Sequence, residues 1–272
     1  MRFGKIVGPV VVAVLAACSP PSESSGASST TQAANRPAAR QIPSGVAQAQ
    51  AGEVSSSQID AIVVEIMNQQ YGKGHREEGS CWNFKYRDGE RDVDYCMEPA
   101  KPELVGPAGR TMYLRVSNRA DAEGAFDATT PGLMGAFQIA IESDGQWRYI
   151  AKSSALPFGT LGYCGCDKAK FVRLGSDYYG WIFTSGGTWQ GVTVSNHEVV
   201  AAHDGAFKDL SDVPEIREDD QNTIYSIEVV AEPEQGGVKS LKVVKAISGK
   251  VQDERLVPFD QARWEYRMPE LF

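Results

Sequence analysis

The most distinctive chemical feature of this chain is a pair of cysteines one residue apart, Cys164 and Cys166. Two thiols at this spacing can chelate a soft metal, cycle as a redox-active dithiol or form structural disulfides. Cys81 and Cys96 stand earlier in the chain, and Cys18 lies close to its start. In an oxidising compartment the four later cysteines favour structural bridges. A redox or metal-handling role for Cys164 and Cys166 is the alternative.

The spacing of the histidines argues against a zinc site. The chain has three, at His75, His197 and His203. His197 and the following glutamate match the start of the zinc-protease motif H-E-x-x-H, but Ala201 stands where the second histidine belongs. A six-residue offset places two rings about 120° apart on a helix and about 20 Å apart on a strand. One zinc ion cannot bind both at about 2.0–2.1 Å, so we expect no metal ligands.

Carboxylates cluster between residues 204 and 220, without the D-x-D-x-D-G spacing of a calcium loop. We interpret them as a solvated acidic loop; they are Asp204, Asp209, Asp212, Glu215, Glu218, Asp219 and Asp220. The chain also lacks a G-x-S-x-G nucleophile motif and a phosphate-binding glycine loop. We therefore expect no catalytic residue and no cofactor. A hydrolase with paired carboxylates is the alternative, because the separation of such a pair depends on folding.

One helix is predicted after residue 57. Ser57 is the expected N-cap and Gly72 the expected stop. Between them, apolar residues recur at helical spacing and predict a face that packs on a core; they are Ile59, Ile62, Val63, Ile66 and Met67.

The segment 81–96 predicts a hairpin that turns at Asp88-Gly89. In the expected register, opposed residue numbers sum to 177, which places Trp82 opposite Tyr95 on an apolar face. The same register places Cys81 opposite Cys96 and predicts a disulfide between them, leaving Cys164 and Cys166 to bridge each other. The competing arrangement links the hairpin to the 164–166 loop.

Three further hairpins are predicted from period-two patterns around turn residues. The first joins 178–183 to 191–194 around Gly186-Gly187, the second joins 137–141 to 147–150 around Asp144-Gly145, and the third joins 224–230 to 241–247 across the 233–237 region. The alternation of Trp264, Tyr266 and Met268 suits a closing strand. Strands outnumber helices and do not alternate with them, so we predict a mainly β (α+β) fold. We expect an antiparallel sandwich-like or open-barrel domain with one N-terminal helix.

Charge argues against nucleic acid as a partner. The chain has 272 residues, with 27 Lys and Arg against 35 Asp and Glu and a net charge of −8. The first 57 residues contain four of the basic and two of the acidic residues, so the predicted folded region is more acidic still. Such a surface repels a phosphate backbone.

The start of the chain has the pattern of an export signal. Arg2 and Lys5 precede an apolar run, 6–17, which is too short to span a bilayer as a helix. The run ends in Leu15-Ala16-Ala17-Cys18, which resembles the lipobox of bacterial lipoproteins at every position. The resemblance covers residues 1–18 only. It implies a signal peptide (1–17), cleavage before Cys18, and attachment of lipid to the Cys18 thiol, which anchors the chain to a membrane. Ser19 in place of Asp implies the outer membrane, facing the periplasm, in a Gram-negative cell.

Residues 18–57 are rich in Ser, Ala, Gln, Gly and Pro and contain no aromatic residue. Such a segment cannot bury enough surface to fold, so we predict a lipidated, disordered tether, followed by one domain at 58–272. A second boundary near residue 130 is the alternative. We expect this tethered domain to bind an envelope protein or a cell-wall component without catalysis. The alternatives are an envelope hydrolase, or a thiol redox or metal-handling protein.

We expect Cys18→Ser to leave an uncleaved precursor that lacks the mass of the lipid, because only a thiol can form the thioether. Mass spectrometry and membrane fractionation measure both effects, with Ser19→Ala as a matched control that keeps the thiol. Normal processing and membrane attachment of Cys18→Ser would contradict the assignment as a lipoprotein.

Overall fold

The computed structural model describes residues 53–73, 75–76, 81–120, 126–235 and 237–269. All of them belong to one compact unit, Ala49–Phe272. The predicted signal peptide, Cys18 and the predicted tether up to residue 52 lie outside the described residues. Within the described ranges, no helix is both long enough and apolar enough to cross a membrane.

Helix α1 (Ser56–Tyr71) begins earlier than the sequence suggests. Its N-cap is Ser55, which has an extended backbone and whose hydroxyl accepts a hydrogen bond from the Gln58 N–H at 3.3 Å. The prediction of Ser57 as the cap was therefore wrong by two residues. Gly72 ends the helix with a φ of 84°, as predicted.

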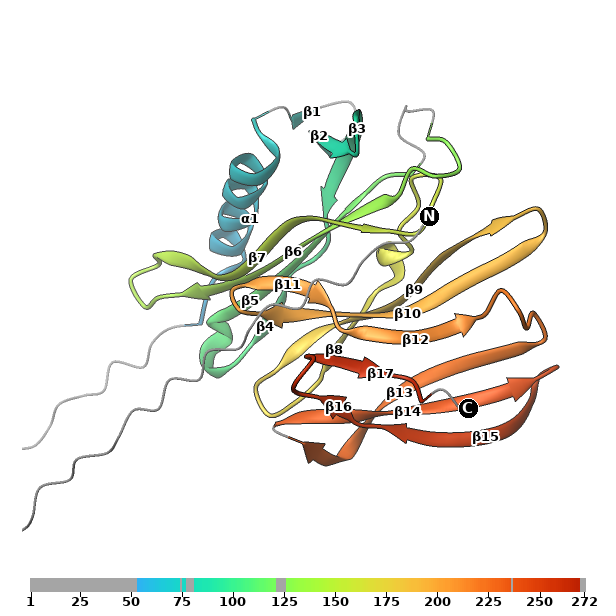
Figure 1. The fold of residues 1–272 in the computed structure, drawn as a ribbon. Coiled ribbons are helices and arrows are strands. Elements are labelled where there is room, and N and C mark those ends of the chain that lie inside the picture. The colour runs from blue at the N-terminus through green and yellow to red at the C-terminus, as the bar shows by residue number, and fades with distance from the viewer. Residues whose placement is uncertain (1–52, 74, 77–80, 121–125, 236, 270–272) are drawn as a thin grey trace, which may run out of the picture. The chain divides into compact units, whose positions relative to one another are not determined.

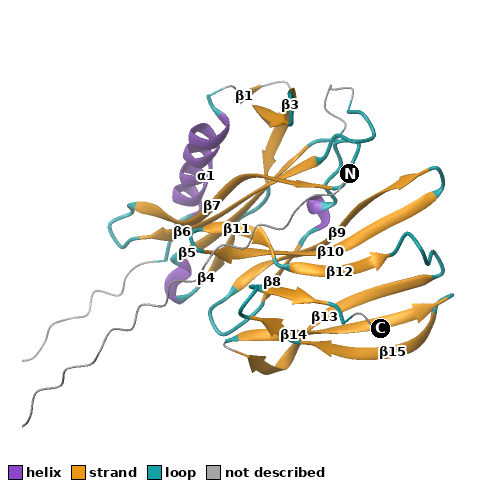
Figure 2. Cartoon of the chain, viewed as in Figure 1, coloured by secondary structure: helices purple, strands orange, loops and turns teal. Residues whose placement is uncertain are grey.

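The strands form three sheets, shown in Figures 1 and 2. Sheet 1 contains β1 (His75–Arg76), β2 (Cys81–Asp88), β3 (Arg91–Pro99), β4 (Glu103–Val105), β5 (Thr111–Asn118), β6 (Gly132–Ile141) and β7 (Trp147–Phe158). Sheet 2 contains β8 (Lys170–Arg173), β9 (Tyr179–Trp189), β10 (Val192–His203), β11 (Ala206–Asp209), β12 (Ser211–Ile216), β16 (Phe259–Asp260) and β17 (Glu265–Arg267). Sheet 3 contains β13 (Thr223–Gln235), β14 (Val238–Ile247) and β15 (Lys250–Val257).

The prediction of a mainly β fold with one N-terminal helix is confirmed. Pairing is antiparallel except between β12 and β17, which run parallel. Sheet 1 follows the order β1-β2-β3-β5-β6-β7, and β4 pairs with β5. Sheet 2 follows the order β16-β17-β12-β10-β9-β8, and β11 pairs with β10. Because β5 pairs directly with β6, sheet 1 continues across residue 130.

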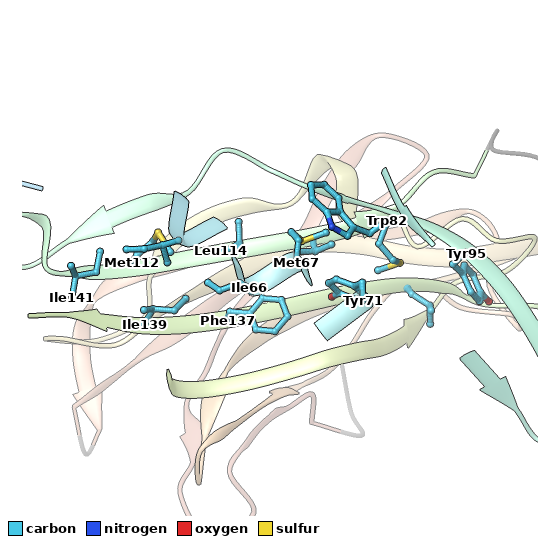
Figure 3. Packing of buried hydrophobic residues seen from close by; sticks show 14 residues of the cluster. Ile66, Met67, Tyr71, Trp82, Tyr95, Met112, Leu114, Phe137, Ile139 and Ile141 are labelled. Carbon is cyan, nitrogen blue, oxygen red and sulfur yellow. The ribbon is translucent and has the colours of Figure 1, made fainter. Parts of the chain in front are cut away.

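Three hydrophobic cores separate four layers. Helix α1 packs on one face of sheet 1, where Figure 3 shows Ile66, Met67 and Tyr71 among the side chains of the sheet. The other face of sheet 1 packs on sheet 2, and the far face of sheet 2 packs on sheet 3. In Figure 1 the colours follow this order from the blue helix through the green strands of sheet 1 and the yellow and orange strands of sheet 2 to the orange and red strands of sheet 3, except that the red strands β16 and β17 belong to sheet 2.

Sheet 2 is therefore buried on both faces. In its central strand β10, Val199 and Ala201 face sheet 3, and Val200 faces sheet 1. All three are completely buried. A strand covered on both faces shows a continuous apolar run in place of alternation, which is the pattern of residues 199–202.

The β2–β3 hairpin forms in a register that differs from the predicted one. Its turn lies at Gly89-Glu90, so Asp88 pairs with Arg91 and Trp82 with Met97. Each residue of β2 therefore faces a residue of β3 two positions further along the chain than predicted. Because side chains alternate between the two faces of a strand with a period of two, every side chain stays on its predicted face. Asn83 is therefore the residue directly opposite Cys96, and Cys81 lies two positions from it along β2. The Cα atoms of these two residues are 5.4 Å apart and a disulfide joins them.

The prediction of a turn at Gly186-Gly187 was wrong. These glycines lie inside β9, and the chain turns at Gln190-Gly191, where both residues have positive φ. A Cβ on Gly186 would lie 2.1 Å from the Val194 carbonyl oxygen, so glycine is required here by close approach of β10. The other two predicted hairpins are confirmed as β6–β7 and β13–β14.

One close approach links the helix to sheet 1. A Cβ on Gly135 would lie 1.9 Å from the Tyr71 hydroxyl, which donates a hydrogen bond to the Ser154 carbonyl at 2.8 Å. We expect Gly135→Ala to destabilise the domain by about 1–3 kcal/mol through overpacking. In a Tyr71→Phe background the same change should cost at least about 0.5 kcal/mol less. Urea unfolding of the wild type, the two single variants and the double variant measures these free energies. If the costs of the two single substitutions add up to the cost of the double substitution, the prediction is contradicted.

Candidate binding groove

The cysteines predicted as site residues lie in two places. Cys81 and Cys96 bridge β2 and β3 in sheet 1, far in sequence from Cys164 and Cys166, which are bonded to each other. Cys18 lies outside the described residues.

The loop that contains Cys164 and Cys166 is packed into the core. The two residues are 3% and 0% exposed. Arg115 of β5 donates to the Cys166 carbonyl at 2.5 Å and to the Asp167 carbonyl at 3.3 Å. A Cβ on Gly165, whose φ is 72°, would lie 2.1 Å from the Thr184 carbonyl oxygen. The loop is therefore held as a rigid wall whose sulfur atoms are withdrawn from solvent, an arrangement that disfavours thiol exchange.

This wall borders a groove of about 670 Å³ between sheet 2 and the strand β13 of sheet 3. Apolar side chains from both sheets line it, namely Val172, Ile182, Phe183, Ile227 and Val229. Polar and charged groups complete the lining, namely Tyr163, Lys168, Lys170, Thr184, His197, Ser226 and Glu228. A mostly apolar concavity with a few polar groups is the usual form of a binding site.

Two lysines give the groove a positive rim. Lys168 and Lys170 are both exposed, and neither forms an ion pair with a carboxylate of the described residues. The Tyr163 hydroxyl and then the Asp167 carboxylate raise the pKa of Lys168, whose Nζ lies 5.7 Å from the centre of the Tyr163 ring. Glu228 is paired with Lys242 at 3.2 Å. Both rim ammonium groups are thus available to an anionic ligand.

His197 closes the inner end of the groove. The residue is 7% exposed, and its Nε2 lies 2.8 Å from the Tyr225 carbonyl oxygen of β13. Burial lowers the pKa of the ring, so it is neutral at pH 7, and the carbonyl partner assigns the proton to Nε2. His197 therefore acts as a hydrogen-bond donor that ties β13 to sheet 2.

Beside the groove, on the opposite face of β10, lies a pair of carboxyl groups. Ser185 donates to Glu198 at 2.5 Å, and the Glu198 side chain is hydrogen-bonded to Asp209. The outer side of Asp209 is exposed, but its Oδ1 accepts hydrogen bonds from the N–H groups of Val199 and Ser211 at 3.0 and 3.1 Å. Burial of the carboxyl group and the adjacent Glu198 raise the pKa of Asp209. The pair therefore shares a proton at neutral pH.

The histidines and the acidic segment have structural partners. His203 stacks on Trp264, with ring centres 4.3 Å apart, and lies 3.1 Å from an Asp204 oxygen. Glu215 accepts from Ser195 at 2.8 Å, and Asp220 from Thr223 at 2.6 Å. In the part of the chain that the structure describes, no three His, Cys, Asp or Glu side chains are grouped to hold a metal ion.

Sequence reasoning missed the rim lysines and the acid pair. The available signal was the polar run Ser195-Asn196-His197-Glu198 at the start of a strand that continues as a buried apolar run. Comparison of the chain with protein-family models, with curated proteins and with solved structures found no match. Its function is therefore inferred from its own residues and their geometry.

The acid pair predicts how stability depends on pH. Because folding raises the pKa of Asp209, the folded state holds a proton that the unfolded state has lost above about pH 4. The free energy of unfolding should then fall as pH rises from 7 to 9, by at most about 1.4 kcal/mol per pH unit for one proton.

We expect Asp209→Asn to flatten this dependence, measured by urea unfolding at each pH. Asp212→Asn on the neighbouring strand β12 is the matched control, because Asp212 is an exposed partner of Arg267. Equal slopes in the wild type and Asp209→Asn would contradict the shared proton.

Proposed function

We propose that this chain is a lipid-anchored protein of the bacterial cell envelope whose β domain binds another envelope macromolecule without catalysis. Cys18 anchors it to the membrane, in a Gram-negative cell to the outer membrane with the domain in the periplasm. The observation that carries the proposal is the groove, which combines an apolar floor with two exposed lysines at its rim that form no ion pair with a carboxylate of the described residues.

The charge of the groove contrasts with that of the chain. The whole chain has a net charge of −8, yet the rim of the groove presents Lys168 and Lys170. A local positive site on an acidic protein steers anionic groups to that place and repels them elsewhere. This favours a partner with an acidic, partly apolar segment, and disfavours nucleic acid, which needs an extended basic surface.

The groups inside the groove suit binding better than catalysis. Its one carboxylate, Glu228, is paired with Lys242, and its one imidazole, His197, is hydrogen-bonded to Tyr225. The acid pair of Glu198 and Asp209 is the observation that favours the alternative, an envelope hydrolase. These carboxyl groups are in hydrogen-bond contact, however, whereas glycoside hydrolases hold theirs about 5–9.5 Å apart.

The thiol alternative is disfavoured by burial. A redox-active cysteine is accessible to the thiol or disulfide that it exchanges with. Cys164 and Cys166 present almost no surface, and the loop between them is packed against Thr184.

We expect a photo-crosslinking amino acid at Thr184 to form a covalent adduct in intact cells, because Thr184 is exposed and lines the groove. The same amino acid at Val64, which is 48% exposed on α1, is the matched control. Gel shift and mass spectrometry measure the adduct, and Lys168→Glu/Lys170→Glu should reduce it. The absence of a Thr184 adduct, or equal adducts at both positions, would contradict the proposal.

A further inference from the structure

One side of β13 has no neighbouring strand among the described residues, because β13 is an end strand of sheet 3. On its other side it pairs with β14, and the register is regular from Thr223 to Val229, with Ile227 opposite Val243. In an antiparallel pair, successive residues direct their N–H and C=O groups alternately toward the partner strand and away from it.

A single hydrogen bond shows which residues of β13 direct their backbone N–H and C=O groups away from β14. The Tyr225 carbonyl accepts from His197 of sheet 2, so it points away from β14. Ile227 and Val229 follow at intervals of two and direct their N–H and C=O groups the same way, toward the groove that both residues line. The backbone bonds to β14 are made by the residues between them, Ser226 and Glu228. Backbone groups at an uncovered edge are a template for another strand.

The other edge of sheet 3 is protected in the usual ways. The strand β15 pairs with β14 through a bulge at Lys245/Ala246. It also carries four charged residues, Lys250, Asp253, Glu254 and Arg255. Charges and bulges prevent pairing with a foreign strand. The segment 223–230 of β13 contains only one charged residue, Glu228, and its register is regular up to Val229, beyond which β13 has a register shift of its own.

We infer that the ligand of the groove is an extended acidic segment of a partner protein, which adds to β13 as a further strand. The inference rests on the proposed function and names the class of its ligand. Main-chain hydrogen bonds to Ile227 and Val229 provide affinity, and alternate side chains of the added strand pack on the apolar floor. Lys168 and Lys170 at the rim select acidic side chains over basic ones.

The first test examines the full-length protein without ligand, by hydrogen exchange detected by NMR. We expect the amides of Ile227 and Val229 to exchange at least tenfold faster than those of Ser226 and Glu228, which bond to β14. Equally slow exchange at all four positions would show that the edge is already occupied and would overturn the inference.

The second test selects binders to the full-length protein from a displayed library of random dodecapeptides. We expect the enriched peptides to alternate apolar with acidic residues, and to slow the exchange of Ile227 and Val229 amides when bound. Lys168→Glu/Lys170→Glu should weaken their binding about tenfold or more. Peptides that bind without protecting these amides would overturn strand addition.

A matched pair of variants isolates the backbone contribution. Ile227→Pro and Ile227→Ala both remove the side chain, but only proline removes the outward N–H, and proline is tolerated at an edge where that N–H faces outward. We expect the selected peptides to bind Ile227→Pro at least about tenfold more weakly than Ile227→Ala, with the exchange of β14 amides confirming that both fold. Equal affinities would overturn the inference.

Failure of the inference can be distinguished from failure of the proposed function. If the Thr184 adduct forms but no peptide is enriched, the ligand is of another class, and sodium dodecanoate then tests the groove for a small anionic amphiphile. That result overturns strand addition and leaves the groove as a binding site. If neither an adduct nor a peptide is obtained, both proposals are wrong.

Discussion

The burial of β10 on both faces is the constraint on which the other layers depend. Val199, Val200 and Ala201 are consecutive and fully buried, so each side of the strand must be covered by another layer. Sheet 1 covers one side and sheet 3 the other. Sheet 1 then presents a second apolar face, and α1 covers it. The succession of helix and three sheets follows from the need to cover both faces of each apolar sheet.

The same burial requires a partner for every polar side chain at the start of β10. Ser195 bonds to Glu215, His197 to Tyr225, and Glu198 to Ser185 and Asp209. The bond from His197 holds β13 against sheet 2 at one point. Beyond it, Ile227 and Val229 lie across a groove from Val172 and Ile182. The groove and its unpaired strand edge are thus produced by the polar segment of the central strand.

Local patterns predicted the elements better than their assembly. Helical spacing located α1, and Asp144-Gly145 and the 233–237 region located two hairpins, because each signal lies within a few residues of sequence. The turn at Gly186-Gly187 was misplaced because Gly186 allows a close approach of Val194 and Gly187 one of Thr160, and only the folded chain reveals these contacts. The groove could not be predicted for the same reason. Its lysines, its histidine and Ile227 come from four segments that are adjacent only after the sheets stack.

Two groups on β10 and β11 make the stability of the domain depend on pH in opposite directions. Burial lowers the pKa of His197, so acid favours the unfolded state once its free histidine takes a proton, below about pH 6.5. The raised pKa of Asp209 has the opposite sign, because the unfolded state loses a proton above about pH 4 that the folded state keeps. Between these limits the two effects have opposite signs and oppose each other. Above about pH 6.5 only the carboxyl effect remains, so the stability contributed by this pair of groups declines toward alkaline pH while the neutral His197 continues to hold β13 at the groove.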